Sequence, residues 1–137
     1  IIANGDVEPC VFVHFAVDNI RGKSLTEVIG SPFFKAIREA QPYDDDNLLR
    51  PCMIIDHPHV LRDIVELQHA HPTHPGAESI LGALSGDLDR YASEVKRVFD
   101  PVWESLGREK YLKGLENEEK RDVHERIGKR PVCRNKG

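Results

Sequence analysis

The sequence predicts a small α+β fold that is mostly α-helical, with an N-terminal β-hairpin followed by several helices. β-Branched and aromatic residues concentrate between residues 11 and 17, close to a strong turn signal, as in a hairpin strand. From residue 24 onward, helix-starting patterns and apolar residues at helical spacing recur. A chain of 137 residues, of which 39% are hydrophobic, suffices for one modest core.

The hairpin is predicted from two adjoining segments. Asn4-Gly5-Asp6 is a turn signal, because Asn and Gly tolerate a positive φ. Residues 11–17 then read as a strand. We therefore expect Cys10 just past the tip of the hairpin.

Two short helices are expected next. Ser24 and Glu27 form a capping box, which predicts a helix to about Ile29. Ser31-Pro32 starts a second helix with proline at its first position, and this helix should end before Pro42. Its apolar residues share one face: Phe33, Phe34 and Ile37.

The middle of the chain is predicted as loop, helix and loop. Residues 43–51 read as loop, residues 58–70 as a helix with apolar residues at helical spacing, and residues 71–76 as loop because of two prolines and a glycine. Helix returns from about Ala77, and Ser85 caps the next piece. Its expected buried stripe is Leu88, Tyr91, Val95 and Val98, and Pro101 is expected to begin another turn.

We expect one folded domain over residues 1–106 and a charged helical or disordered tail over residues 107–137, with an exposed helix at 116–126. The formal net charge of −4 gives no basic footprint, so a nucleic-acid partner is not expected. No apolar run approaches the roughly 20 residues of a membrane helix, and no signal peptide is visible, so we expect a cytoplasmic protein without a membrane partner. Because the chain opens on Ile1 in what reads as a strand end, we expect upstream sequence to be missing.

Three cysteines, at positions 10, 52 and 133, are a poor disulfide framework and fit a reducing compartment. Cys10 closes a G-x4-C pattern on a turn, where a thiolate can face a soft metal or an iron–sulfur cluster. Cys52 lies at a boundary between elements. Taken alone, each cysteine is more often a small packing residue than a ligand. Cys133 lies in the tail, where ordering costs entropy, so we favour no ligand role for it.

Five histidines fall within eighteen residues: His57, His59, His69, His71 and His74. Imidazole is a common ligand of zinc and other transition metals. The spacing matches no closed metal motif, so loop and capping histidines are favoured over a mononuclear site. The phosphate-binding glycine loops and the GxSxG elbow are also missing, and no catalytic residue is assigned.

Several elements occur in a familiar order: Asn4-Gly5-Asp6-Val7-Glu8-Pro9-Cys10, Asp18-Asn19-Ile20, Ser24-Leu25-Thr26-Glu27-Val28, Ser31-Pro32-Phe33-Phe34 and Pro51-Cys52. In this order they resemble the SPASM region of radical SAM proteins. The resemblance covers about residues 2–60. Residues 70–78 are similar to the continuation of one branch of these proteins, although that match is less specific.

The resemblance implies a small cap that carries auxiliary [4Fe–4S] clusters and follows a partial TIM barrel. That barrel binds SAM and the catalytic cluster through CxxxCxxC, and it is the partner expected upstream in an oxidoreductase of this kind. By the same resemblance, Cys10 matches the cysteine that closes the G-x4-C element, and Cys52 the first cysteine of a later group. Cys52 is followed by Met53 rather than by a CxxC step, and the family's upstream cysteine would precede Ile1.

At most one auxiliary cluster is therefore expected, with two thiolates from this chain and His57 or His59 as a replacement ligand. CxxxCxxC does not occur in this sequence, so the chain alone should be catalytically silent, with SAM bound only in the full-length parent. The substrate and the reaction stay open, as does whether the chain acts as part of an enzyme. Two alternatives are a small zinc-like His/Cys module and a purely structural or interaction module.

Overall fold

The computed structural model describes residues 1–43, 47–109, 111, 113 and 114, and divides the chain into two compact units, residues 1–100 and 101–137. The described residues form α-helices and one small antiparallel sheet, which confirms the predicted α+β, mostly α class. None of the helices described is both long and apolar enough to cross a membrane. The predicted domain boundary at residue 106 stays a prediction.

The predicted turn at residues 4–6 is present. The Gly5 N–H donates to the Ile2 carbonyl at 2.9 Å, and Gly5 has a φ of 97°. A Cβ at this position would lie 2.6 Å from Oδ1 of Asn19. Gly5 is therefore required both by the backbone conformation and by the side chain packed against it.

The hairpin itself turns further along the chain than expected. Antiparallel bridges join Asp6 to Asn19 and Cys10 to Val13. Residues 11 and 12 form an exposed turn rather than part of a strand. Cys10 thus lies at the tip of the hairpin, and the predicted strand over 11–17 is reduced to β1 (Phe15–Ala16).

The partner of β1 lies in a segment that the sequence predicted as loop. β2 (His71–Pro72) pairs with β1 in antiparallel register, Phe15 opposite Pro72 and Ala16 opposite His71. Thr73 extends the contact, since its N–H donates to the His14 carbonyl at 3.0 Å. Pro72 is tolerated because an edge strand can leave one N–H position unused.

The first two helices follow the prediction closely. α1 (Leu25–Ile29) begins with the predicted capping box, in which the Ser24 hydroxyl and the Glu27 carboxylate each accept the other residue's N–H. α2 (Pro32–Glu39) starts with its proline and buries Phe33 and Ile37.

α3 (Pro58–Leu67) ends three residues earlier than predicted. His69 takes a φ of 51°, its N–H donates to Glu66, and the Ala70 N–H donates to Val65 at 3.0 Å. This is the Schellman ending, with histidine in the place that glycine usually occupies. It turns the chain back so that residues 71–72 reach β1.

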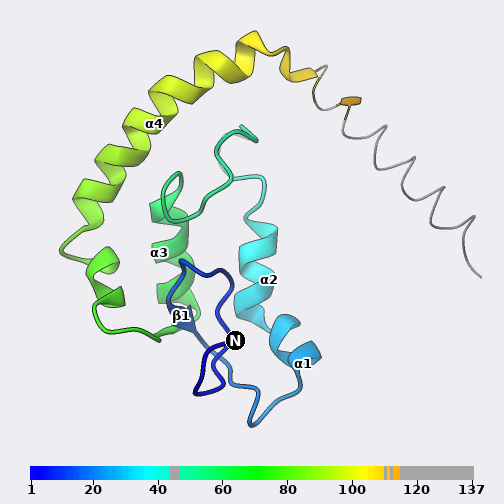
Figure 1. Ribbon diagram of the computed structural model, residues 1–137, viewed down its shortest axis with the longest axis vertical. Coiled ribbons are helices and arrows are strands. Elements are labelled where there is room, and N and C mark those ends of the chain that lie inside the picture. Colours follow the sequence, from blue (N-terminus) through cyan, green and yellow to red (C-terminus); the bar gives the residue numbers. More distant parts are fainter. Residues whose placement is uncertain (44–46, 110, 112, 115–137) are drawn as a thin grey trace, which may run out of the picture. The chain divides into compact units, whose positions relative to one another are not determined.

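The core of the first unit lies where the hairpin, α2 and α3 meet, with the hairpin running between the two helices in Figure 1. Buried side chains from all three, together with Met53 from the turn after Cys52, make one cluster: Val13, Phe15, Phe33, Ile37, Met53, Leu61, Ile64 and Val65. The N-terminal segment therefore shares its core with α3.

A 3-10 helix, η1 (Ala77–Leu81), precedes α4 (Ser85–Ser105). α4 continues through Pro101, so the turn expected there is not a new element. The expected buried stripe is also wrong in part, because Tyr91 and Val98 are exposed whereas Ala92 is buried. In the second unit, the ring of Trp103 contacts that of Tyr111 edge-on, with the ring centroids 5.3 Å apart. The helix expected at 116–126 lies outside the described residues.

Candidate functional site

Cys52 begins a tight turn in which both its carbonyl and its N–H make hydrogen bonds. Its carbonyl accepts the N–H groups of Asp56 and His57 at 2.8 and 3.3 Å. Its own N–H donates to Oδ2 of Asp56 at 2.8 Å. The thiol is free and half-buried, so the turn presents one sulfur in a defined position.

A buried arginine holds this turn in place. Arg50 is 4% exposed, and its Nη2 donates to the Asp56 carbonyl at 3.0 Å. Its Nη1 lies 3.7 Å from Oδ1 of Asp100 on α4, which also accepts from Asn47 at 3.0 Å. Burial acts to raise the pKa of Asp100, but hydrogen bonds from Asn47 and Lys96 and the charges of Lys96 and Arg50 outweigh it, so the pKa lies below its ordinary value.

His57 is buried behind the same turn. Its Nε2 lies 2.9 Å from the Arg50 carbonyl, so this nitrogen must be the protonated donor. Its ring stacks on Tyr43, with centroids 4.3 Å apart. His59 is exposed, with its ring 6.4 Å from that of His57.

Cys10 lies at the hairpin tip as a free, exposed thiol. Its carbonyl accepts the Val13 N–H at 3.0 Å, which closes the turn. Between them, Val11 and Phe12 are 72% and 68% exposed. Cys133 lies outside the described residues.

The ring of Tyr43 stacks on His57 and packs against the core. Burial raises the pKa of Tyr43, a hydrogen bond from Gln41 opposes this, and negative charge on Cys52, Asp56 and Cys10 raises it further.

The two thiols fit an iron–sulfur cluster only as part of a ligand set. Such clusters normally take four thiolates. Within the described part of the chain, no three His, Cys, Asp or Glu side chains are grouped so that they could hold a metal ion. A complete set from Cys10, Cys52, His57 and His59 is therefore not assembled there.

The remaining histidines separate into different surroundings. His71 Nε2 lies 3.4 Å from Oδ2 of Asp6, and His14 Nδ1 lies 3.2 Å from Oε1 of Glu8. The Thr73 hydroxyl donates to the same Glu8 oxygen. His74 packs its ring against His14 at 5.1 Å. The contacts of His71, Thr73 and His74 attach the segment after α3 to the hairpin.

Asp6 should make the stability of the fold depend on acid pH. The hydrogen bond from Asn19 is the largest cause that lowers its pKa; burial opposes it, and Asn4 and His71 add to the lowering. A carboxyl group whose pKa is lowered by folding stabilises the fold fully above its ordinary pKa, and this contribution is lost as pH falls through the lowered value.

Asp6→Asn should therefore cost the most stability near neutral pH, and the difference from wild type should shrink below the ordinary pKa of aspartate, about 4. Urea unfolding over a pH series measures it. Asp63→Asn, on an exposed position of α3, controls for the loss of one negative charge. A difference between Asp6→Asn and wild type that stays constant with pH would contradict this assignment.

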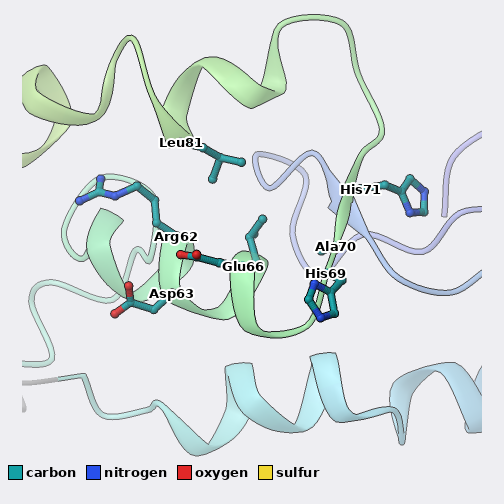
Figure 2. A pocket seen from close by; sticks show the side chains of 8 residues that line it. Arg62, Asp63, Glu66, His69, Ala70, His71 and Leu81 are labelled. Atoms are coloured by element: carbon teal, nitrogen blue, oxygen red, sulfur yellow. The ribbon is translucent and has the colours of Figure 1, made fainter.

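A cavity of about 670 Å³ lies beside α3. Figure 2 shows Arg62, Asp63 and Glu66 extending from α3, while the rings of His69 and His71 lie well apart and point in different directions. Nη2 of Arg62 donates to both carboxylate oxygens of Asp89, at 2.7 and 2.9 Å. With its arginine engaged and its histidines separated, this cavity offers no converging donor set.

Sequence reasoning missed three residues of the thiol site: Tyr43, Arg50 and Asp56. Tyr43 and Arg50 were assigned only to a loop, and Asp56 was given no role in the site. No spacing rule marks Tyr43, because its stacking contact with His57 joins segments that are distant in sequence. The position of Arg50 and Asp56 on either side of Cys52 was the one available signal.

Comparison with known proteins gives one match. Residues 1–54 match the SPASM family, described as an iron-sulfur cluster-binding domain. The match supports a SPASM-type iron–sulfur cluster-binding domain in this part of the chain, which contains both Cys10 and Cys52. No curated protein and no solved structure is similar enough to count as a match.

Proposed function

We propose that residues 1–54 are the auxiliary cluster-binding part of a radical SAM oxidoreductase, with Cys10 and Cys52 as two thiolate ligands of a [4Fe–4S] cluster. The observation that carries the proposal is the SPASM match, because it spans both cysteines. Both cysteines lie on turns that are closed by backbone hydrogen bonds, which supports it.

Neighbouring residues hold the backbones of both cysteines. Asp56 and Arg50 fix the backbone of Cys52, and the bridge to Val13 fixes that of Cys10. When bound, an iron–sulfur cluster supplies one-electron transfer. The other ligands and the SAM-binding barrel would come from outside the described residues, and the chain alone would be catalytically silent in the cytoplasm.

The proposal is tested by iron and acid-labile sulfide in the full chain after reconstitution without oxygen. The wild type should bind both in near-equal amounts, and the double variant Cys10→Ala, Cys52→Ala should lose them, since the remaining thiol cannot hold a cluster. Cys133→Ala is the matched control and should keep both.

The other outcomes separate the alternatives. Metal without sulfide would identify a mononuclear site of the zinc type and overturn the cluster. Neither metal nor sulfide, with unchanged folding of the double variant, would leave the two cysteines as packing residues of a structural module.

A further inference from the structure

α4 carries a row of apolar residues that is open to solvent. Starting at the residue that directly precedes the helix, they recur at intervals of four, three, four and three, and we call them the α4 stripe: Leu84, Leu88, Tyr91, Val95 and Val98. Tyr91 is 54% exposed and Val98 59%, Leu84 is also exposed, and the other two are half-buried. We propose that the α4 stripe is an interface between two antiparallel copies of this chain.

α4 contacts the rest of its unit through a different, largely polar face. Asp89 accepts two hydrogen bonds from Nη2 of Arg62, and Asp100 accepts one from Asn47 at 3.0 Å. Between them along the helix, Ala92 is 8% exposed. At about 100° per residue, this face is centred roughly 120° around the helix axis from the α4 stripe. The helix thus directs polar groups to its own unit and apolar side chains to solvent, as a helix with a further partner does.

The spacing of the stripe indicates another helix as the partner. Alternating intervals of three and four keep side chains along one seam, where they pack between those of a facing helix. Among the described helices, α2 and α3 bury their apolar faces in the core of the first unit, and α1 has only five residues. The matching stripe is therefore that of α4 in a second copy. In an antiparallel pair, Tyr91 lies opposite Val95 and Leu88 opposite Val98, and each contact occurs twice.

Charged residues along one edge of the stripe make this face complementary to itself. Asp87, Arg90, Glu94 and Arg97 follow the edge that lies away from Ala92, at intervals of three, four and three. In the antiparallel register, Asp87 comes within about 3 Å along the axis of Arg97 of the second copy, and Arg90 equally near Glu94. Acid and base therefore meet in four pairs. In a parallel pair this edge would lie against the Ala92 edge, and its charges would have no such counterparts.

The experiment measures the oligomeric state of the full chain by sedimentation equilibrium. The concentration series reaches about 1 mM, because a contact on one helix face is small and expected to be weak. Neither Cys10 nor Cys52 belongs to the interface, so the proteins are compared without reconstitution and with a reducing agent. Wild type is compared with Tyr91→Lys and with the control Leu67→Lys, at a leucine of α3 that is 71% exposed. Urea unfolding checks that each variant is folded.

We expect wild type and Leu67→Lys to form dimers with the same dissociation constant. In Tyr91→Lys the dissociation constant should rise by about tenfold or more, because a charged side chain replaces a ring at the centre of the interface. A wild type that stays monomeric throughout the series would overturn the proposal. A dimer that Tyr91→Lys leaves unchanged would also overturn it, because the interface would then lie elsewhere.

A charge reversal tests the orientation of the two copies. Arg97→Glu alone should weaken the dimer, because it places an acid beside Asp87 of the second copy. Adding Asp87→Arg to it recreates the pair with its charges exchanged and should recover dimerisation. Loss of dimerisation in the single variant with no recovery in the folded double variant would overturn the antiparallel arrangement.

Discussion

Replacing Arg50 with methionine is expected to lower the free energy of unfolding by about 3 kcal/mol, because it leaves buried hydrogen-bonding groups without their charged partner. Arg50 is 4% exposed and reaches the Asp56 carbonyl on one side and Asp100 on the other. Methionine fills much of the same volume, so the loss measures the polar contacts more than the packing.

Chemical denaturation of both proteins measures this difference. Arg90→Met is the matched control, since Arg90 is exposed and pairs with Asp87 on the surface of α4, where such pairs contribute about 0.5 kcal/mol or less. The Cys52 N–H, which donates to Asp56, should also exchange faster with deuterium in Arg50→Met. A loss of stability no greater than that of Arg90→Met would show that the arginine does not hold the cysteine turn.

The parts of the fold that the sequence predicted well depend on neighbouring residues. The capping box of α1 and the proline that begins α2 act within one helical turn, so their patterns can be read directly. The pairing of β1 with β2 joins residues more than fifty positions apart, and no local pattern encodes it. His69 was unexpected for a related reason, because a positive φ at histidine is set by the chain reversal that this pairing requires.

The candidate site shows the same contrast between features set by neighbouring residues and features set by distant segments. The expectation that Cys10 and Cys52 are ligands came from the resemblance to the SPASM region, since a family pattern records which positions carry sulfur. Their order along the chain did not show that the tip of the hairpin is at Cys10, nor that Arg50 and Asp56 fix the turn of Cys52. Side chains that support a site from distant segments are visible only when the packing is known.

The SPASM match ends at residue 54, but the core continues into α3. Replacing Leu61 tests whether α3 belongs to the same folding unit as the matched residues. Leu61 lies on α3, beyond residue 54, yet it is 1% exposed and packs in the same cluster as Val13 and Met53. Leu61→Ala should therefore lower the free energy of unfolding by about 2–5 kcal/mol, through lost burial and the cavity left behind.

Leu67→Ala is the matched control, the same substitution on the same helix at a side chain that is 71% exposed, and it should change stability by about 0.5 kcal/mol or less. If both variants unfold with the wild-type midpoint in urea, α3 is not part of the cooperative unit, and residues 1–54 fold without it. If only Leu61→Ala is destabilised, α3 belongs to the structural unit that places the two cysteines. Leu61→Ala can also be reconstituted with iron and sulfide at a temperature where part of it is unfolded. The bound iron and sulfide should then fall in proportion to the unfolded fraction. The reason is that the turns of Cys10 and Cys52 are attached to that core through Val13 and Met53.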